Sequence, residues 1–350
     1  MSFPVQRAGR GVDLEGADVT TGARAFWLRE PGHGEIRATD LPGPGPGEVL
    51  VRAVASGVSR GTETLVFRGG VPADQYAVMR APFQEGDLPG PVKYGYLSVG
   101  VVEAGEAALV GRTVFCLHPH QTAYVVPAAA VHVVPEDVPA RRAVLAGSVE
   151  TAVNALWDAG PLVGDRVAVV GAGMVGACVA RLLAGIPGTE VWLVDVDPSR
   201  EKLATDLGVR FATPDEAPRD LDLAFHASGS PAGLQVSLDL LGEEGTVTDL
   251  SWYGDTPVTL RLGGAFHSSR LTIRASQVGR VAPSRRDRRT TADRLALALS
   301  LLADPAYDAL LTGESAFAEL PDLMPRLVSG ELPAICHTIA YDGEEPTCSR

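Results

Sequence analysis

The segment VAVVGAGMVGACVARLLAG, residues 167–185, decides how this chain folds. Its first four residues are apolar, as in a buried strand, and the residues from Met174 onward have the composition of a helix. Between them, Gly171, Gly173 and Gly176 have the spacing GxGxxG. Glycines at this spacing permit a tight turn, a close approach of a phosphate group to the backbone, and close packing of the helix on the strand. The segment therefore predicts a dinucleotide-binding turn between a strand and a helix.

An acidic residue follows this turn at the expected distance. Asp195 lies in the next predicted strand, 190–197, about two dozen residues after Gly171. Its carboxylate can accept both adenosine-ribose hydroxyls and would repel a 2′-phosphate, so NAD is the expected cofactor. Arg200 could pair with a 2′-phosphate and keeps NADP as the minor alternative. We expect the N–H groups of Met174 and Val175, in the first turn of the helix, to face the pyrophosphate.

Strands and helices alternate through the second half of the chain. The expected strands are 166–171, 190–197, 221–228 and 245–252, and the expected helices are 174–186, 199–208 and 231–242. This alternation predicts an α/β fold with a doubly wound parallel sheet, a Rossmann domain. Ser228 and Gly229, at the end of a strand, are further expected cofactor contacts. A helix at 293–304 and a strand at 337–342 predict that the chain then returns to its first domain.

The first part of the chain has a different pattern, with short β-branched runs between turns. Strands are expected at 23–30, 47–56, 96–105 and 112–117, which predicts a β-rich, barrel-like domain. We expect the chain to have four parts: a flexible leader at 1–22, a catalytic domain at 23–154, a Rossmann domain at 155–277 and a return segment at 278–350.

Composition restricts the class of function. The 350 residues carry a net charge of −13, which argues against nucleic acid as a partner. No apolar run approaches the roughly 20 residues of a membrane span, and the first 22 residues lack the apolar stretch of a signal peptide. The four cysteines are far apart, as expected for reduced thiols. We expect a cytoplasmic protein with a small-molecule substrate and no membrane partner.

Several segments resemble the zinc-type alcohol dehydrogenases of the medium-chain dehydrogenase/reductase superfamily, over nearly the whole chain after residue 23. The segments are VRAVASGVSRGTET, GYLSVGVVEAG and GDRVAVVGAGMVG. Within that superfamily, SRGTE, KYGYLSVG, FCLHPHQTAYVVP, ETAVNAL and SQVGRVAPSRR resemble the bacteriochlorophyllide dehydrogenase-like branch. The resemblance implies a GroES-like catalytic domain before the Rossmann domain, hydride transfer, and a homodimer. It also implies that Arg60 lies against the NAD pyrophosphate.

The zinc-ligand positions of these relatives are changed in this chain. The resemblance places Ser59 at the first position, Tyr96 at the second and Ala146 near the third. Zinc binds thiolate, imidazole and carboxylate groups, so these residues do not fit it. The four-cysteine lobe of the relatives also has no counterpart. The residues Cys116, His118 and His120 could share one face of a strand, but Pro119 interrupts them and no fourth ligand is evident. We expect no metal.

Without zinc, a side chain must hold the proton that accompanies hydride transfer. Tyr96 is the first candidate, and the alternative is an aromatic side chain that fills the lost metal site. A nearby positive charge, from the nicotinamide or from Lys93, would lower the pKa of its phenol. Ser59 and Thr62 could relay a proton or simply fill space. Glu150 could act as a base or could be an acidic residue at a helix start.

Three further residues are candidates for the substrate cleft. His118 and His120 could shuttle protons there, or they could be structural residues with satisfied hydrogen bonds. Arg280 precedes Arg285 and Arg286 and could bind an anionic group of the substrate; the alternative is a solvated turn.

These observations predict a zinc-independent, NAD-dependent oxidoreductase that interconverts a secondary alcohol and a ketone. One alternative is an NAD(P)H-dependent reductase of enones or quinones. The other is an NAD-binding regulatory protein without catalytic activity.

Overall fold

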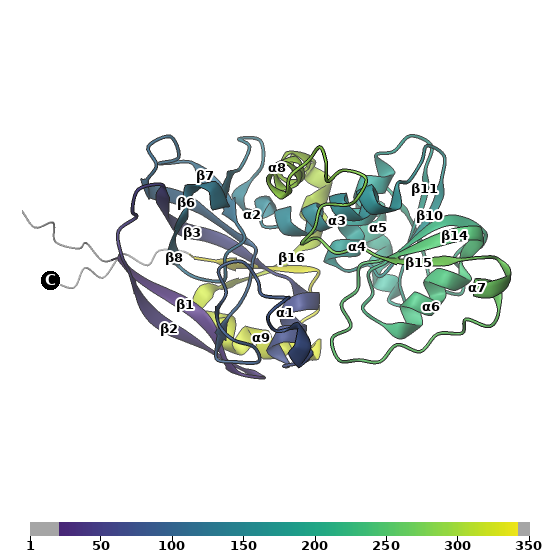
Figure 1. Ribbon diagram of the computed structural model, residues 1–350, viewed down its shortest axis with the longest axis horizontal. Helices are drawn as coiled ribbons and strands as arrows, with labels where there is room; N and C mark the ends of the chain where they lie inside the picture. The colour runs from purple at the N-terminus through teal and green to yellow at the C-terminus, as the bar shows by residue number, and fades with distance from the viewer. Residues whose placement is uncertain (1–20, 342–350) are drawn as a thin grey trace, which may run out of the picture.

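The computed structural model describes residues 21–341 as two lobes side by side (Figure 1). One lobe is rich in β-strands, and the other is built around a parallel sheet. Most of the predicted leader lies outside the described residues. Its last two residues, Thr21 and Gly22, instead begin strand β1 (Thr21–Glu30), because they pair with Leu41 and Asp40 of strand β2 (His33–Leu41).

The second lobe contains a six-stranded, all-parallel sheet in the order β12-β11-β10-β13-β14-β15. The strands are β10 (Arg166–Val170), β11 (Glu190–Val194), β12 (Arg210–Ala212), β13 (Leu221–His226), β14 (Leu241–Asp249) and β15 (Thr272–Ala275). Numbered along the domain, this is the strand order 3-2-1-4-5-6 of the doubly wound dinucleotide-binding fold. The predicted parallel sheet is confirmed. The sequence did not single out β12 and β15, because runs of 3 and 4 residues carry little periodic signal.

Both faces of this sheet are covered, which explains why β10 is apolar at successive positions. Val167 and Val169 belong to the core that includes buried residues of helices α3 and α4, whereas Ala168 and Val170 belong to the core that includes residues of helix α6.

The helices of the described residues are α1 (Arg60–Phe67), α2 (Ala140–Ala143), α3 (Ala146–Ala159), α4 (Met174–Ala184), α5 (Glu201–Asp206), α6 (Pro231–Asp239), α7 (Ala265–Ser268), α8 (Thr291–Leu301) and α9 (Leu320–Ser329). Within residues 21–341, no helix has the length and apolar character needed to cross a membrane.

The β-rich lobe contains two sheets. A seven-stranded sheet has the order β16-β17-β3-β6-β7-β9, with β8 paired to β3 off this path, and a four-stranded sheet has the order β2-β1-β5-β4. These strands are β3 (Glu48–Val58), β4 (Glu85–Gly86), β5 (Val92–Lys93), β6 (Ser98–Gly105), β7 (Thr113–Cys116), β8 (Ala123–Pro127), β9 (Val131–Val133), β16 (Leu311–Ala316) and β17 (Cys336–Ala340). Because β17 pairs with β3, the end of the described chain lies in the sheet of the first lobe.

A buried ion pair joins α3 to α8. Arg294 is 1% exposed, and its guanidinium donates to Glu150 Oε1 at 3.0 Å and to Asn154 Oδ1 at 2.5 Å. It also donates to the backbone carbonyl oxygens of Val278 and Arg280. Burial raises the pKa of Glu150, and Arg294 opposes that effect. The carboxylate therefore balances a charge that would otherwise be buried alone.

Replacing Glu150 with alanine should reduce the free energy of unfolding by about 3–5 kcal/mol, because Arg294 would remain buried without its counter-charge. Urea denaturation measures this change. Glu190→Ala is the control, since Glu190 forms an exposed pair with Arg210 at 3.5 Å and should contribute less than about 1 kcal/mol. Unchanged stability of Glu150→Ala together with loss of turnover would instead make Glu150 a catalytic base.

Candidate functional site

The glycine turn lies between β10 and α4, at the carboxyl edge of the parallel sheet. Gly171 has φ +108°, a conformation that favours glycine, and a Cβ added there would lie 2.6 Å from Ser228 N. A Cβ on Gly176 would lie 1.9 Å from the carbonyl oxygen of Gly171. Packing of the helix and the neighbouring strand therefore accounts for these two glycines.

Gly173 differs, because a Cβ added to it meets no atom within 4 Å. Packing within the protein does not require a glycine at this position. Gly173 precedes α4, whose first N–H groups, those of Met174, Val175 and Gly176, have no partner within the helix. Open space in front of a helix N-terminus suits a pyrophosphate, so these residues fit the diphosphate of a dinucleotide.

Asp195 follows β11 at the same edge of the sheet. Its Oδ2 accepts a hydrogen bond from Ala172 N at 2.7 Å, and its Oδ1 accepts one from Asp197 N at 3.0 Å. These bonds hold the half-buried carboxylate beside the glycine turn. Arg200 is paired with Asp197, at 3.4 Å, and that pairing competes with a 2′-phosphate for its guanidinium.

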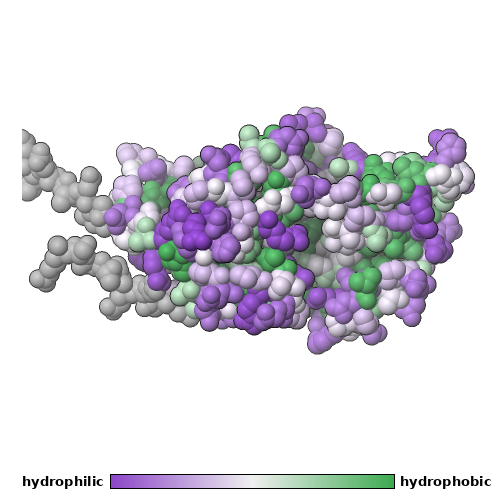
Figure 2. Space-filling view, turned by 90° about the horizontal axis from the view of Figure 1, so that it is seen from below, coloured by the Kyte–Doolittle hydropathy of each residue, from purple (hydrophilic) through white to green (hydrophobic). Residues whose placement is uncertain are grey.

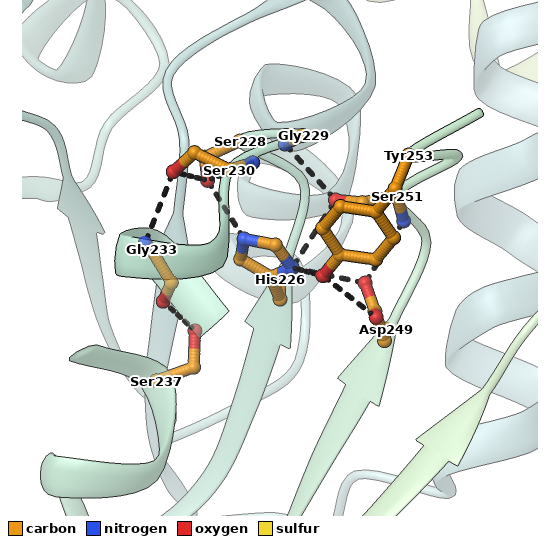
Figure 3. A network of polar contacts seen from close by, with 9 residues as sticks. All are labelled: His226, Ser228, Gly229, Ser230, Gly233, Ser237, Asp249, Ser251 and Tyr253. Atoms are coloured by element: carbon orange, nitrogen blue, oxygen red, sulfur yellow. Dashed lines mark hydrogen bonds and ion pairs between the residues drawn. The ribbon is translucent and has the colours of Figure 1, made fainter. Parts of the chain in front are cut away.

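Ser228 and Gly229 follow β13, beside the glycine turn. The N–H of Gly229 donates to Ser251 Oγ at 3.0 Å, and Ser228 Oγ lies 2.7 Å from His226 Nε2 (Figure 3). His226 and Ser251 were not predicted. A polar residue at the end of an apolar strand, as in the segment LDLAFHAS, is the signal that could have identified His226.

Two of the three positions that the resemblance aligned with zinc ligands are in direct contact. Ser59 precedes α1, and its Oγ accepts a hydrogen bond from Tyr96 at 2.6 Å. Ala146 begins α3, and a Cβ on the next residue, Gly147, would lie 2.6 Å from Cδ2 of Leu97. A hydroxyl and a phenol are thus hydrogen-bonded, and the buried Leu97, next to Tyr96 in the sequence, packs against the first turn of α3. These residues do not fit a zinc ion, and no group of three His, Cys, Asp or Glu residues in the described part of the chain could hold a metal.

The environment of Tyr96 raises its pKa. Burial is the main cause, the negative charge of Glu63 adds to it, and hydrogen bonding with Ser59 and Thr62 opposes it, so that the pKa reaches about 12. The phenol is therefore protonated at neutral pH, and it can donate a proton or a hydrogen bond.

Lys93 does not supply the positive charge that was expected beside this phenol. Its buried ammonium group donates to Gln121 Oε1 at 2.6 Å and forms an ion pair with Glu85. Glu150 is also engaged elsewhere, in the ion pair between α3 and α8. These contacts do not place the side chain of Lys93 or that of Glu150 beside Tyr96.

A chain of polar groups lies behind Ser59, and of its members only His120 was predicted. Glu63 Oε1 accepts from Ser59 N at 2.7 Å, and Glu63 Oε2 lies 2.9 Å from His120 Nε2. His120 Nδ1 lies 2.7 Å from Ser56 Oγ, which lies 2.8 Å from the hydroxyl of Tyr341. The carboxylate in SRGTE, four residues after Ser59, is the sequence signal that was overlooked.

His118 occupies a different environment from His120. Its ring stacks on Tyr124 with centroids 3.8 Å apart, and its Nδ1 lies 2.9 Å from the carbonyl oxygen of Pro119. Burial lowers the pKa of His118 to about 3, so the ring is neutral at physiological pH. Burial likewise raises the pKa of Cys116 to about 12, which keeps its thiol protonated.

The two remaining arginine candidates lie near the surface. Arg60 begins α1, is partly exposed, and donates to the carbonyl oxygen of Ala334 at 3.3 Å. Arg280 lies in the exposed connection between β15 and α8, where its backbone carbonyl accepts from Arg294. Seen from below, the surface is hollowed at the boundary between the lobes, and apolar side chains are visible in the hollow (Figure 2).

Comparison with known proteins finds a partial sequence relative and several solved structures with a similar fold. No protein-family profile matches the chain. The chain is 26% identical to the (R,R)-butanediol dehydrogenase of Saccharomyces cerevisiae over 178 residues, which are 47% of this chain and 43% of that enzyme. The chain therefore matches less than half the length of this relative.

Solved structures match over much more of the chain. L-idonate 5-dehydrogenase from Escherichia coli has a TM-score of 0.76 at 15% identity, over 92% of this chain and 99% of that one. The 2R,3R-butanediol dehydrogenase from Bacillus subtilis has a TM-score of 0.73 at 16% identity, over 91% and 100%. A third, the E. coli alcohol dehydrogenase rspB in complex with NADH, has a TM-score of 0.72 at 18% identity, over 92% and 100%.

These likenesses show that the chain has the fold of zinc-type, medium-chain alcohol dehydrogenases, with a GroES-like domain and a Rossmann domain. The fold that the sequence resemblance implied is confirmed. The narrower branch resemblance stays a prediction.

Two alanine variants separate cofactor binding from packing in the glycine turn. Gly173→Ala should raise the Kd for NADH at least about tenfold, because the methyl group enters the pyrophosphate space, and should cost about 1 kcal/mol or less in stability. Gly176→Ala should reduce stability by about 2–3 kcal/mol, because its Cβ meets the carbonyl oxygen of Gly171. Fluorescence titration and thermal unfolding measure the two effects. Tight NADH binding by Gly173→Ala would show that the pyrophosphate does not bind at this turn.

Proposed function

We propose that this protein is a zinc-independent, NAD-dependent oxidoreductase that interconverts a secondary alcohol and a ketone. One observation carries the proposal: a phenol and a hydroxyl, Tyr96 and Ser59, are hydrogen-bonded at the positions that the resemblance aligns with the metal ligands of this fold. The named substrates of two relatives, butanediol and L-idonate, support a small hydroxylated substrate.

The proposed chemistry divides between the cofactor and the side chains of the β-rich lobe. A bound nicotinamide supplies or accepts the hydride. Tyr96 holds the proton: its phenol is protonated at neutral pH and can give that proton to the carbonyl oxygen of a ketone as hydride arrives at the carbonyl carbon. Ser59 fixes the direction of the phenol through its 2.6 Å hydrogen bond. Glu63 accepts from the backbone N–H of Ser59 and so holds that residue in place.

The proposed preference for NAD rests on Asp195. Its carboxylate lies at the end of the second strand of the domain and would face the adenosine ribose. A 2′-phosphate in the same place would meet that negative charge. One matched structure, a zinc-binding dehydrogenase from Sinorhizobium meliloti, is bound to NADP, so the fold itself admits either cofactor and the choice lies with individual residues.

Tyr96→Phe should lower the turnover of ketone reduction by about 10²- to 10⁴-fold, the usual contribution of a general acid, with an unchanged Kd for NADH. Tyr94→Phe makes the same chemical change in a buried neighbour, 6.2 Å away between ring centroids, and should leave turnover largely intact. Steady-state kinetics on a panel of secondary alcohols and ketones provides the measurement.

Three results would each point elsewhere. Full turnover by Tyr96→Phe, or stoichiometric zinc in elemental analysis of the purified protein, would contradict the proposed mechanism. Reduction of enones or quinones but not of ketones would favour the reductase alternative. Tight NADH binding without turnover on any substrate would favour the regulatory alternative.

Asp195→Asn should reduce the preference for NADH over NADPH at least about tenfold, because it removes the negative charge and keeps an oxygen that can accept from Ala172 N. Parallel titrations with both cofactors test this. Asp206→Asn is the control, since Asp206 forms an exposed pair with Lys202 on α5. A preserved preference for NADH would mean that another group selects the ribose.

A further inference from the structure

The strand order determines where the two halves of a dinucleotide would lie. The order reverses between β10 and β13, and α4 begins at that point. With the pyrophosphate at α4 and the adenosine at Asp195 beyond β11, the nicotinamide half extends the other way, over the ends of β13 and β14. This placement rests on the proposed function.

A single buried histidine connects the segments that follow those two strands. His226 is the last residue of β13 and is 0% exposed. Its Nε2 lies 2.7 Å from Ser228 Oγ, and its Nδ1 lies 2.9 Å from Oδ1 of Asp249, the last residue of β14 (Figure 3). One ring nitrogen thus contacts the turn that follows its own strand, and the other contacts the end of the neighbouring strand.

This arrangement of Ser228, His226 and Asp249 has the connectivity of a hydrolytic triad, but the serine is not free to attack a substrate. Ser228 Oγ lies 3.0 Å from Ser230 Oγ, and a Cβ on Gly233 would lie 2.1 Å from it. Ser230 in turn caps α6 by accepting from Gly233 N. The hydroxyl of Ser228 therefore points into the start of α6, where it fixes the turn.

The same network holds the segment after β14. We call residues 250–255 the strap. The hydroxyl of Tyr253 donates to Asp249 Oδ2 at 3.0 Å, and the backbone N–H of Ser251 donates to Asp249 Oδ1 at 2.9 Å. Ser251 Oγ then accepts from Gly229 N, which closes a ring of contacts from β13 to the strap.

The strap also touches the β-rich lobe. Asp255 N donates to the carbonyl oxygen of Gly70 at 3.2 Å, and a Cβ on Gly254 would lie 2.3 Å from that oxygen. Trp252 packs against the core of the β-rich lobe that contains Phe67. The strap thus contacts both the His226 network and the β-rich lobe.

We propose that His226 is a positioning residue for the nicotinamide half of the cofactor. By holding the turn at Ser228 and Gly229 and the strap in one arrangement, it fixes the surface on which that half lies. Binding of the nicotinamide half is thereby coupled to the contact between the lobes, whereas the adenosine half at Asp195 is independent of His226.

The test compares NADH with AMP, which carries only the adenosine half, by calorimetry on the full chain. His226→Asn should raise the Kd for NADH at least about tenfold and leave the Kd for AMP within about twofold. Tyr253→Phe, which removes one hydroxyl from the network and keeps the ring, should weaken NADH binding by a smaller factor and leave AMP unaffected. Ser237→Ala is the control, since Ser237 donates within α6 to Gly233 O, at the far end of the network in Figure 3, and forms no hydrogen bond with His226 itself.

Two outcomes overturn this inference alone. NADH binding that is unchanged in both network variants would show that the network does not position the nicotinamide half. Equal weakening of NADH and AMP would show a general effect on the domain. A wild-type chain that binds AMP but not NADH would instead overturn the proposed function, and with it the placement on which the inference rests.

Discussion

The contact between Gly176 and the carbonyl oxygen of Gly171 is the constraint on which the arrangement of this protein depends. No side chain fits between them, so α4 begins directly against the end of β10. That contact places the N-terminus of α4 where the strand order reverses, beside the turn after β13. The first N–H groups of the helix, the open space at Gly173 and the carboxylate of Asp195 then lie at one edge of the sheet.

The β-rich lobe contains the two side chains to which the proposed proton transfer is assigned. Where the resemblance expects metal ligands, this chain has a hydrogen-bonded phenol and hydroxyl, with an apolar side chain packed against α3. A metal ion would lower the pKa of a bound alcohol, whereas burial here raises the pKa of the phenol. The proposed chemistry therefore depends on a proton donor that stays protonated at neutral pH.

Three pairs of buried polar groups have partners from distant parts of the sequence. Glu63 lies beside His120, His226 beside Asp249, and Arg294 beside Glu150. The Glu63–His120 and Arg294–Glu150 pairs join segments that are far apart in the sequence, whereas His226 and Asp249 also face each other in the ladder of β13 and β14. Because an unpaired charge in the interior is costly, such pairs favour one arrangement of those segments. In the second lobe, this constraint extends through the strap to the contact with the first.

The sequence by itself determined the glycine turn, the following helix, the acidic residue of the next strand and the parallel sheet, because these features are encoded by local spacing and periodicity. It also indicated that Ser59, Tyr96 and Ala146 replace metal ligands, through resemblance. It could not show that Lys93 binds Gln121 and Glu85, or that Glu150 balances Arg294, because these partners lie far apart in the chain.

Only the tertiary structure placed Glu63 against Ser59 and His120, and only it assembled the network around His226. Glutamate, histidine, serine and aspartate are common in any chain. Their roles here arise from packing between helices and strands whose contacts cannot be read from the spacing of residues in the sequence. Periodicity fixes which way a strand or helix faces, whereas burial and pairing between distant segments decide what each polar side chain meets.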